Sequence, residues 1–239
     1  MLTQRALATA TLAVLGVLAG CESPAPVQAP NAPPRETEST VRAFEPPAGA
    51  VRYVLDPARS RLEARVYRAG PFARLGHNHV VTAVGATGEA WVGATPDASG
   101  FAIVVPVASL VVDDPAARAA AGPDFGGEVS SSAREGTYAN MTRAEVLDLA
   151  GHPTITLRCD GLQGRWESPV APVDVTLRGV TRRIDVPLEV SRSEGAVSAS
   201  GEFRIRQSDF GITPFSVAGG AIQVADEVTL SFSVVAVLR

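Results

Sequence analysis

The chain has no lysine, only two cysteines and few aromatic residues, and its formal net charge of −4 is small. Aromatic residues make up 5% of the 239 positions, and the 21 basic residues, all arginine, are outnumbered by 25 acidic ones. This balance argues against a nucleic-acid-binding protein, which usually has a basic excess. Two cysteines exclude a disulfide scaffold. After the N-terminal segment, no apolar run reaches the roughly 18 residues that a membrane-spanning helix needs.

The first 21 residues predict export and lipid anchoring. Arg5 supplies a positive charge, and residues 6–18 form an apolar run of the length typical of signal peptides. The run ends in Leu18-Ala19-Gly20-Cys21, which resembles the lipobox of bacterial lipoproteins. We therefore expect residues 1–20 to be a signal peptide and Cys21 to be acylated. The alternative is an ordinary cleavage site beside a chance cysteine.

A proline-rich segment follows the predicted anchor. Residues 22–50 hold seven prolines among Ser, Thr, Glu and Ala, a composition that favours extended chain over a packed core. Residues 21–50 would then be a lipidated tether, and residues 51–239 a single domain. We expect a location in the bacterial cell envelope, facing the periplasm. Glu22 after Cys21 favours the outer membrane by analogy with enterobacterial sorting rules. Acylation of Cys21 would leave Cys159 unpaired, and we expect Cys159 to be buried.

Alternation of apolar and polar residues predicts an all-β domain. Leu62, Ala64 and Val66 share one face of a strand, while Arg61, Glu63 and Arg65 share the other. The same alternation occurs in four further stretches, at 101–107, 173–178, 203–206 and 230–238. Many half-buried antiparallel strands predict a sandwich or a barrel, and the pattern alone does not choose between them.

Two helical pieces are expected in the middle of this domain. Asp114 is placed to cap a helix that begins at Pro115 and ends at Gly122. Residues 142–145 have the spacing of a capping box, which predicts a second short helix after them. The serines at 130–132 are interpreted as a loop.

A pair of histidines is the sharpest polar feature. If residues 77–79 are extended, His77 and His79 lie on one face and Asn78 on the other. Three readings stay open: structural histidines held by hydrogen bonds, contacts to a ligand head group, or two ligands of a metal ion. Zinc usually requires three or four protein ligands, and the remaining histidine, His152, is far along the chain. We therefore assign no metal site.

Catalytic motifs are not evident. The chain lacks the G-x-S-x-G nucleophile elbow, and its glycines do not lead into a helix with lysine as a phosphate loop would. Ser208-Asp209-Phe210-Gly211 is interpreted as a turn. We expect no enzymatic activity and no cofactor.

Several motifs in order resemble the YceI-like family of exported, lipocalin-like proteins. The resemblance covers most of residues 51–239. It rests on the opening strand pair at 53–56 and 60–62, on the stretches 107–113 and 152–157, on the hairpin at 177–182, and on the turn at 208–212. Residues 75–80 resemble the family's G-H-(D/N)-H variant. Gln207 replaces the arginine that family members usually carry before the turn.

The resemblance implies an eight-stranded antiparallel lipocalin-like barrel with a short helical insertion. Its lumen would hold an isoprenoid-like ligand, such as a polyprenyl lipid or a quinone, and a barrel of this size is wide enough for a slender ligand. The expected ligand contacts are His77, His79, Val105, Val175, Phe203, Phe210 and Phe232. Protein partners are not predicted. Two other classes remain open: a metal-binding or redox-associated envelope protein that uses the histidine pair, and a structural barrel without a ligand.

Overall fold

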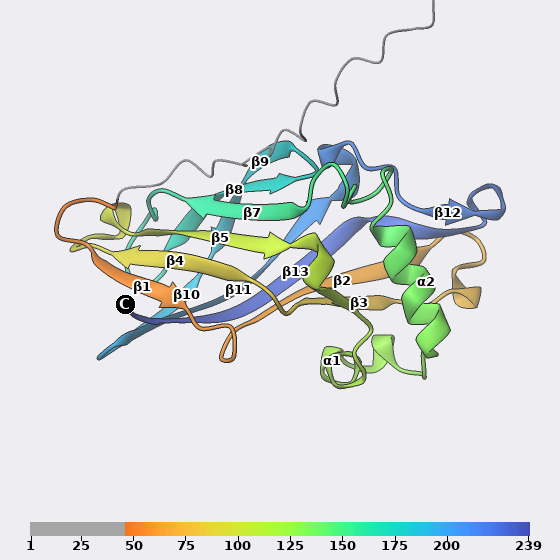
Figure 1. The fold of residues 1–239 in the computed structure, drawn as a ribbon, viewed down its shortest axis with the longest axis horizontal. Helices are drawn as coiled ribbons and strands as arrows, with labels where there is room; N and C mark the ends of the chain where they lie inside the picture. Colours follow the sequence, from red (N-terminus) through yellow and green to blue (C-terminus); the bar gives the residue numbers. More distant parts are fainter. Residues whose placement is uncertain (1–45) are drawn as a thin grey trace, which may run out of the picture. The chain divides into compact units, whose positions relative to one another are not determined.

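The computed structural model describes residues 46–239, which form antiparallel β-structure with two α-helices (Figure 1). The strands are β1 (Val51–Leu55), β2 (Arg61–Ala69), β3 (His79–Ala83), β4 (Thr87–Val92), β5 (Gly100–Pro106), β6 (Leu110–Val112), β7 (Thr154–Cys159), β8 (Val170–Leu177), β9 (Val180–Pro187), β10 (Glu189–Ser193), β11 (Ala196–Arg206), β12 (Ser216–Val217) and β13 (Ile222–Leu238). The helices α1 (Pro115–Ala121) and α2 (Ser131–Met141) both lie between β6 and β7.

The long strand β13 organises the sheet. One of its edges pairs with β11, and the other pairs first with β2 and then with β1. From there the sheet continues in two branches, β2–β3–β6 and β1–β4–β5–β7–β8–β9, while β10 pairs with β11. Among the strands of residues 46–239, β9 and β11 are not paired with each other. The sheet is therefore not closed.

The prediction of a closed, eight-stranded barrel is wrong in both respects, because the sheet is open and has thirteen strands. The higher count has a structural reason. β1 and β2 pair with successive stretches of β13, and the chain between them bends where Ser60 Oγ accepts a hydrogen bond from Val235 N–H. A 3₁₀ turn at Val107–Ser109 interrupts β5 and β6 in the same way. Breaks within long strands are not visible in a period-two pattern.

The alternating stretches themselves are strands, as predicted. The stretch at 61–67 lies in β2, and the others lie in β5, β8, β11 and β13. β8 shows the pattern most regularly, because every second residue from Ala171 to Leu177 is buried. The antiparallel, half-buried character predicted from the sequence is confirmed by the observed pairing.

The first predicted helix is confirmed and the second is wrong. Asp114 caps α1 by accepting hydrogen bonds from two backbone N–H groups, and Gly122 ends it with φ +99°. Residues 142–151, which include the stretch after the predicted capping box, form no helix; Thr142 instead ends α2, which begins earlier at Ser131 with Ser130 as its cap. Ser130 accepts a hydrogen bond from the N–H of Ala133, and Ser131 and Ser132 lie in the first turn of α2, so the interpretation of these serines as a loop is wrong. Within residues 46–239, no helix is both long and apolar enough to cross a bilayer.

Candidate functional site: an apolar internal cavity

The sheet surrounds an internal cavity of about 410 Å³. Its wall is mainly aliphatic and aromatic and includes side chains from almost every strand, from β1 to β13. The lining residues of β13 extend from Val224 to Ala236, and the regular stretch from Val228 to Ala236 alone corresponds to a length of about 26 Å at roughly 3.3 Å per residue. The volume lies within the range of sites that hold small apolar ligands, about 300–1,000 Å³.

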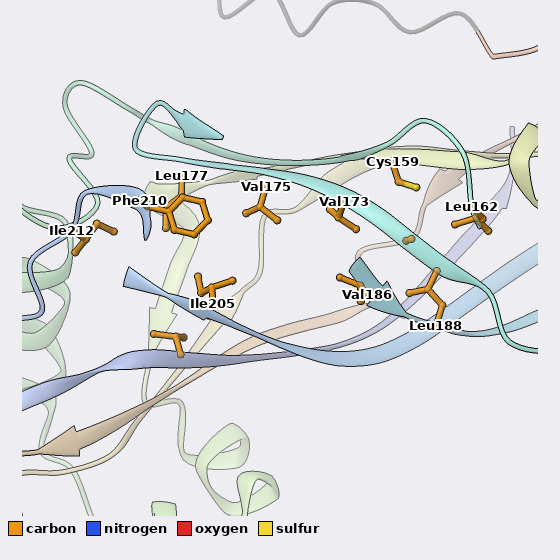
Figure 2. Close-up of a cluster of buried hydrophobic side chains, with 12 residues drawn as sticks. Cys159, Leu162, Val173, Val175, Leu177, Val186, Leu188, Ile205, Phe210 and Ile212 are labelled. Carbon is orange, nitrogen blue, oxygen red and sulfur yellow. The ribbon is translucent and has the colours of Figure 1, made fainter. Parts of the chain in front are cut away.

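The wall follows directly from strand alternation. Val173, Val175 and Leu177 of β8 point inward, and Figure 2 shows them opposite Ile205 of β11 and beside Val186 of β9. At one end of this row lie Leu162 and Leu188, and at the other lie Phe210 and Ile212 (Figure 2). Apolar side chains from both sides of the open seam between β9 and β11 therefore contribute to one core.

Each end of the cavity carries an aromatic ring with an arginine over it. The guanidinium of Arg192 lies 4.1 Å from the centre of the Trp166 ring. At the other end, the guanidinium of Arg143 lies 5.5 Å from the ring of Phe215. Both rings line the cavity, and both arginines are exposed. Cation–π contacts of this kind hold a ring in place while the charge stays in water.

Five of the seven residues predicted to contact the ligand line the cavity, and two do not. The five are His79, Val105, Val175, Phe203 and Phe232. Phe210 is only 1% exposed, but it packs behind the wall in the 3₁₀ turn Gln207–Phe210. His77 lies in the exposed loop before β3, so it does not share a strand face with His79. Cys21, the predicted lipidation site, lies outside the described residues.

Because only His79 belongs to the strand, the structure does not bring the histidine pair together. His152 lies instead near Asp148, with 3.8 Å between Nε2 and Oδ2. Among residues 46–239, no group of three or more His, Cys, Asp or Glu side chains is arranged to hold a metal ion.

His79 is the single histidine of the cavity wall, and a buried charge network fixes its ring. Its Nδ1 lies 2.6 Å from Oδ2 of Asp113. Oδ1 of Asp113 accepts hydrogen bonds from Val80 N–H at 3.0 Å and from Arg118 at 2.7 Å. Arg118 also donates to the carbonyl oxygen of Asn78. Asp113 is fully buried, and Arg118 is nearly so.

The ionised form of Asp113 is the stable one. Burial alone would raise the pKa of this carboxyl group, but hydrogen bonds from His79, from the Val80 N–H and from Arg118 together hold its pKa below the ordinary value. Asp113 also has φ +53°, an uncommon conformation for a residue other than glycine. The contacts above keep the backbone in that conformation.

Sequence reasoning missed Asp113 and Arg118. In the sequence, Asp113 is only the last residue of the stretch 107–113 that resembles the family, and the helix cap is assigned to its neighbour Asp114. Arg118 lies in a short alanine-rich helix, and no sequence motif distinguishes it from the other arginines of the chain. The signal that points to them is the burial of α1: Ala117 packs with Val80 and Phe125 in a small core, so the helix must bury the charge beside it.

Hydrogen bonds from the 3₁₀ turn Gln207–Phe210 hold the segment of β13 in which the pairing with β2 shifts register. The pairing of β13 with β2 shifts between Val224 and Val228. Gln207 donates to the carbonyl oxygen of Ala225, and Ser208 donates to Asp226 through both its N–H and its hydroxyl group. Gln207 thus has a structural partner and at the same time lines the cavity.

These observations define a class: an antiparallel β protein that encloses an elongated apolar cavity, as lipocalin-like proteins do. The model of the YceI-like domain matches residues 53–236, and the chain belongs to this family. A search of curated proteins finds no match.

Two solved structures are similar to this chain. The chain is similar to Burkholderia cenocepacia BcnA at 16% identity and a TM-score of 0.57, covering 76% of this chain and 98% of that one. It is also similar to a Campylobacter jejuni YCEI protein at 14% identity and a TM-score of 0.49, covering 66% of this chain and 84% of that one. At such identities, the first likeness supports the fold.

Proposed function

We propose that this protein binds an apolar, chain-like ligand, of the isoprenoid lipid or quinone type, in its internal cavity. The observation that carries the proposal is the cavity itself, about 410 Å³ with a mainly aliphatic and aromatic wall. Burial of apolar surface contributes roughly 25 cal/mol per Å². The binding free energy of a slender hydrocarbon chain would therefore grow with the length of chain that the cavity buries. The role is binding and not catalysis.

The lining carries few titratable groups, which supports a carrier for an uncharged chain. They are Glu63, Glu89 and His79. The carboxylate of Glu63 binds Arg61 at 2.7 Å, and that of Glu89 binds Arg239 at 3.2 Å. The two acids are therefore paired with arginines, which leaves His79 as the titratable group of the wall that is available to a ligand.

Organic extraction of the purified full chain, followed by mass spectrometry, tests the binding. We expect a stoichiometric long-chain lipid or quinone. Val175→Phe places a ring in the cavity and should reduce the amount retained several-fold. Val84→Phe is the matched control, because Val84 is 59% exposed and does not line the cavity. Circular dichroism verifies that both variants fold. A protein that yields no such ligand and binds no added long-chain probe would contradict the proposal.

We also propose that the protein is a lipoprotein of the bacterial envelope, anchored through Cys21 and facing the periplasm at the outer membrane. The support is the sequence Leu18-Ala19-Gly20-Cys21. Cys21→Ser should remove the protein from the membrane fraction or leave it unprocessed, whereas Cys159→Ser should not. A Cys21→Ser protein that stays in the membrane at its mature size would refute the anchor.

A further inference from the structure

The hydrogen bonds of Asp113 determine which nitrogen of His79 carries a proton. An ionised carboxylate only accepts hydrogen bonds, so the 2.6 Å contact requires the proton on Nδ1 of His79. The buried guanidinium of Arg118 on the other carboxylate oxygen keeps Asp113 in that acceptor role. In neutral imidazole, a proton on Nδ1 leaves Nε2 as an acceptor.

The second nitrogen, Nε2, has no hydrogen-bond partner among residues 46–239. His79 shares the inward face of β3 with Val81 and Ala83, and all three residues line the cavity. Since the two ring nitrogens point to different sides of the imidazole, the side turned away from Asp113 presents an acceptor. The side chain of His79 is 19% exposed, so Nε2 is accessible to water, and a ligand that displaces this water gains by supplying a donor in its place.

We propose that Nε2 of His79 accepts a hydrogen bond from a hydroxyl group at the polar end of the ligand. The ligand class is then a long-chain alcohol or phenol, in preference to a chain that ends in an ether or carbonyl. This inference rests on the proposed function, because it describes the polar end of the same cavity. An acceptor-only head would place two acceptors against each other and leave both unpaired.

Other polar side chains of the wall include Asn140 and Thr137 of α2 and Gln207. The amide of Gln207 already donates to Ala225, and the hydroxyl of Thr137 donates to the backbone of its own helix. Unlike these side chains, His79 has an acceptor whose orientation is set by a buried charge network. His79 is a specificity-determining residue that Asp113 and Arg118 position.

The test compares geranylgeraniol with its methyl ether, which has the same chain but no hydroxyl donor. The full chain is stripped of bound lipid, and both affinities are measured at pH 8, where free imidazole is neutral. We expect the wild type to prefer the alcohol by about fivefold, the size of one net hydrogen bond. His79→Phe should abolish the preference while it still binds the ether. His77→Phe, in the exposed loop, should retain it.

A second measurement does not depend on variants. In protein labelled with ¹⁵N-histidine, the resonances of His79 should show the proton on Nδ1, and the Nε2 resonance should shift with the alcohol but not with the ether. Equal binding of the two probes, or a proton on Nε2, would overturn the inference and leave the proposed function intact. Failure of both probes to bind would overturn the proposed function as well.

Discussion

Strands β8 and β3 both form walls of the cavity, yet they are built differently. In β8 every second residue is buried, and the other face carries groups such as the exposed Asp174–Arg183 ion pair. In β3 the consecutive residues Val80 and Val81 are both buried, because α1 and Phe125 cover the outer face at Val80. A strand with one face in water needs only alternating apolar and polar residues. A strand that is apolar on both faces, such as β3, also needs the helical insertion to cover its outer face.

The wall around β3 also contains buried charged side chains, whereas the charged side chains beside β8 lie at the surface. Beside β3, a buried aspartate, a buried arginine and a histidine form one hydrogen-bonded network. Beside β8, the ion pair of Asp174 and Arg183 is at the surface, where such pairs contribute little. We expect changes in the β3 region to affect stability and ligand choice more than comparable changes around β8.

The largest effect should follow from Arg118→Leu. This change leaves the buried Asp113 carboxylate without its arginine, and loss of one partner of a buried pair costs about 3–5 kcal/mol of unfolding free energy. Urea unfolding followed by circular dichroism measures it. The control Arg165→Leu removes an arginine whose side chain is 87% exposed and should change stability by less than about 0.5 kcal/mol. Equal effects of the two variants would remove the contrast between the regions.

Truncation of an aromatic residue should come next. Phe125→Ala removes a ring that is 2% exposed and packs 5.4 Å from the Tyr67 ring, centre to centre, so we expect a loss of about 3 kcal/mol. Phe203→Ala removes a partly buried ring that borders the cavity, and should cost about 1–2 kcal/mol. Thermal unfolding of the ligand-free proteins compares them. A larger loss at Phe203 would show that the cavity wall is packed as tightly as the core under α1.

Acid should weaken the β3 region selectively. The folded-state pKa of Asp113 is lowered, so its contribution is fully present above the unfolded pKa near 4 and disappears as the pH falls through the lower folded value. Asp113→Asn removes this titration, although it also lowers stability at neutral pH. The difference in unfolding free energy between wild type and Asp113→Asn should therefore shrink below about pH 4. A difference independent of pH would contradict the lowered pKa.

The smallest effect concerns Cys159, in the region of β7 and β8. Burial raises the pKa of its thiol to about 11, and the side chain is 1% exposed. In a Cys21→Ser background, an aromatic disulfide reagent at pH 8 should label folded protein at a small fraction of the rate for urea-unfolded protein. Fast labelling of the folded state would show that this wall opens readily.

The inward faces of β5, β8, β11 and β13 were predictable in large part, and much of the β3 region was not. Val105, Val175, Phe203 and Phe232 were assigned inward from period-two alternation, and all four line the cavity. Alternation reports the face of a strand, so it succeeds wherever one face meets water. It failed for His77 because the strand begins only at His79. Phe210 was expected to contact the ligand although it belongs to a predicted turn, and in the 3₁₀ turn Gln207–Phe210 it does not line the cavity.

The sequence by itself determined the antiparallel strands, the cap and end of α1, and the family, because alternation, capping residues and short motifs are local. Tertiary structure alone decided that long strands break at bends, that β9 and β11 leave the sheet open, and that Asp113, Arg118 and His79 meet. Asp113 and His79 are 34 positions apart, and the hydrogen bond between them depends on β6 pairing with β3 and on α1 covering it. No local pattern encodes such a meeting, because it results from long-range packing.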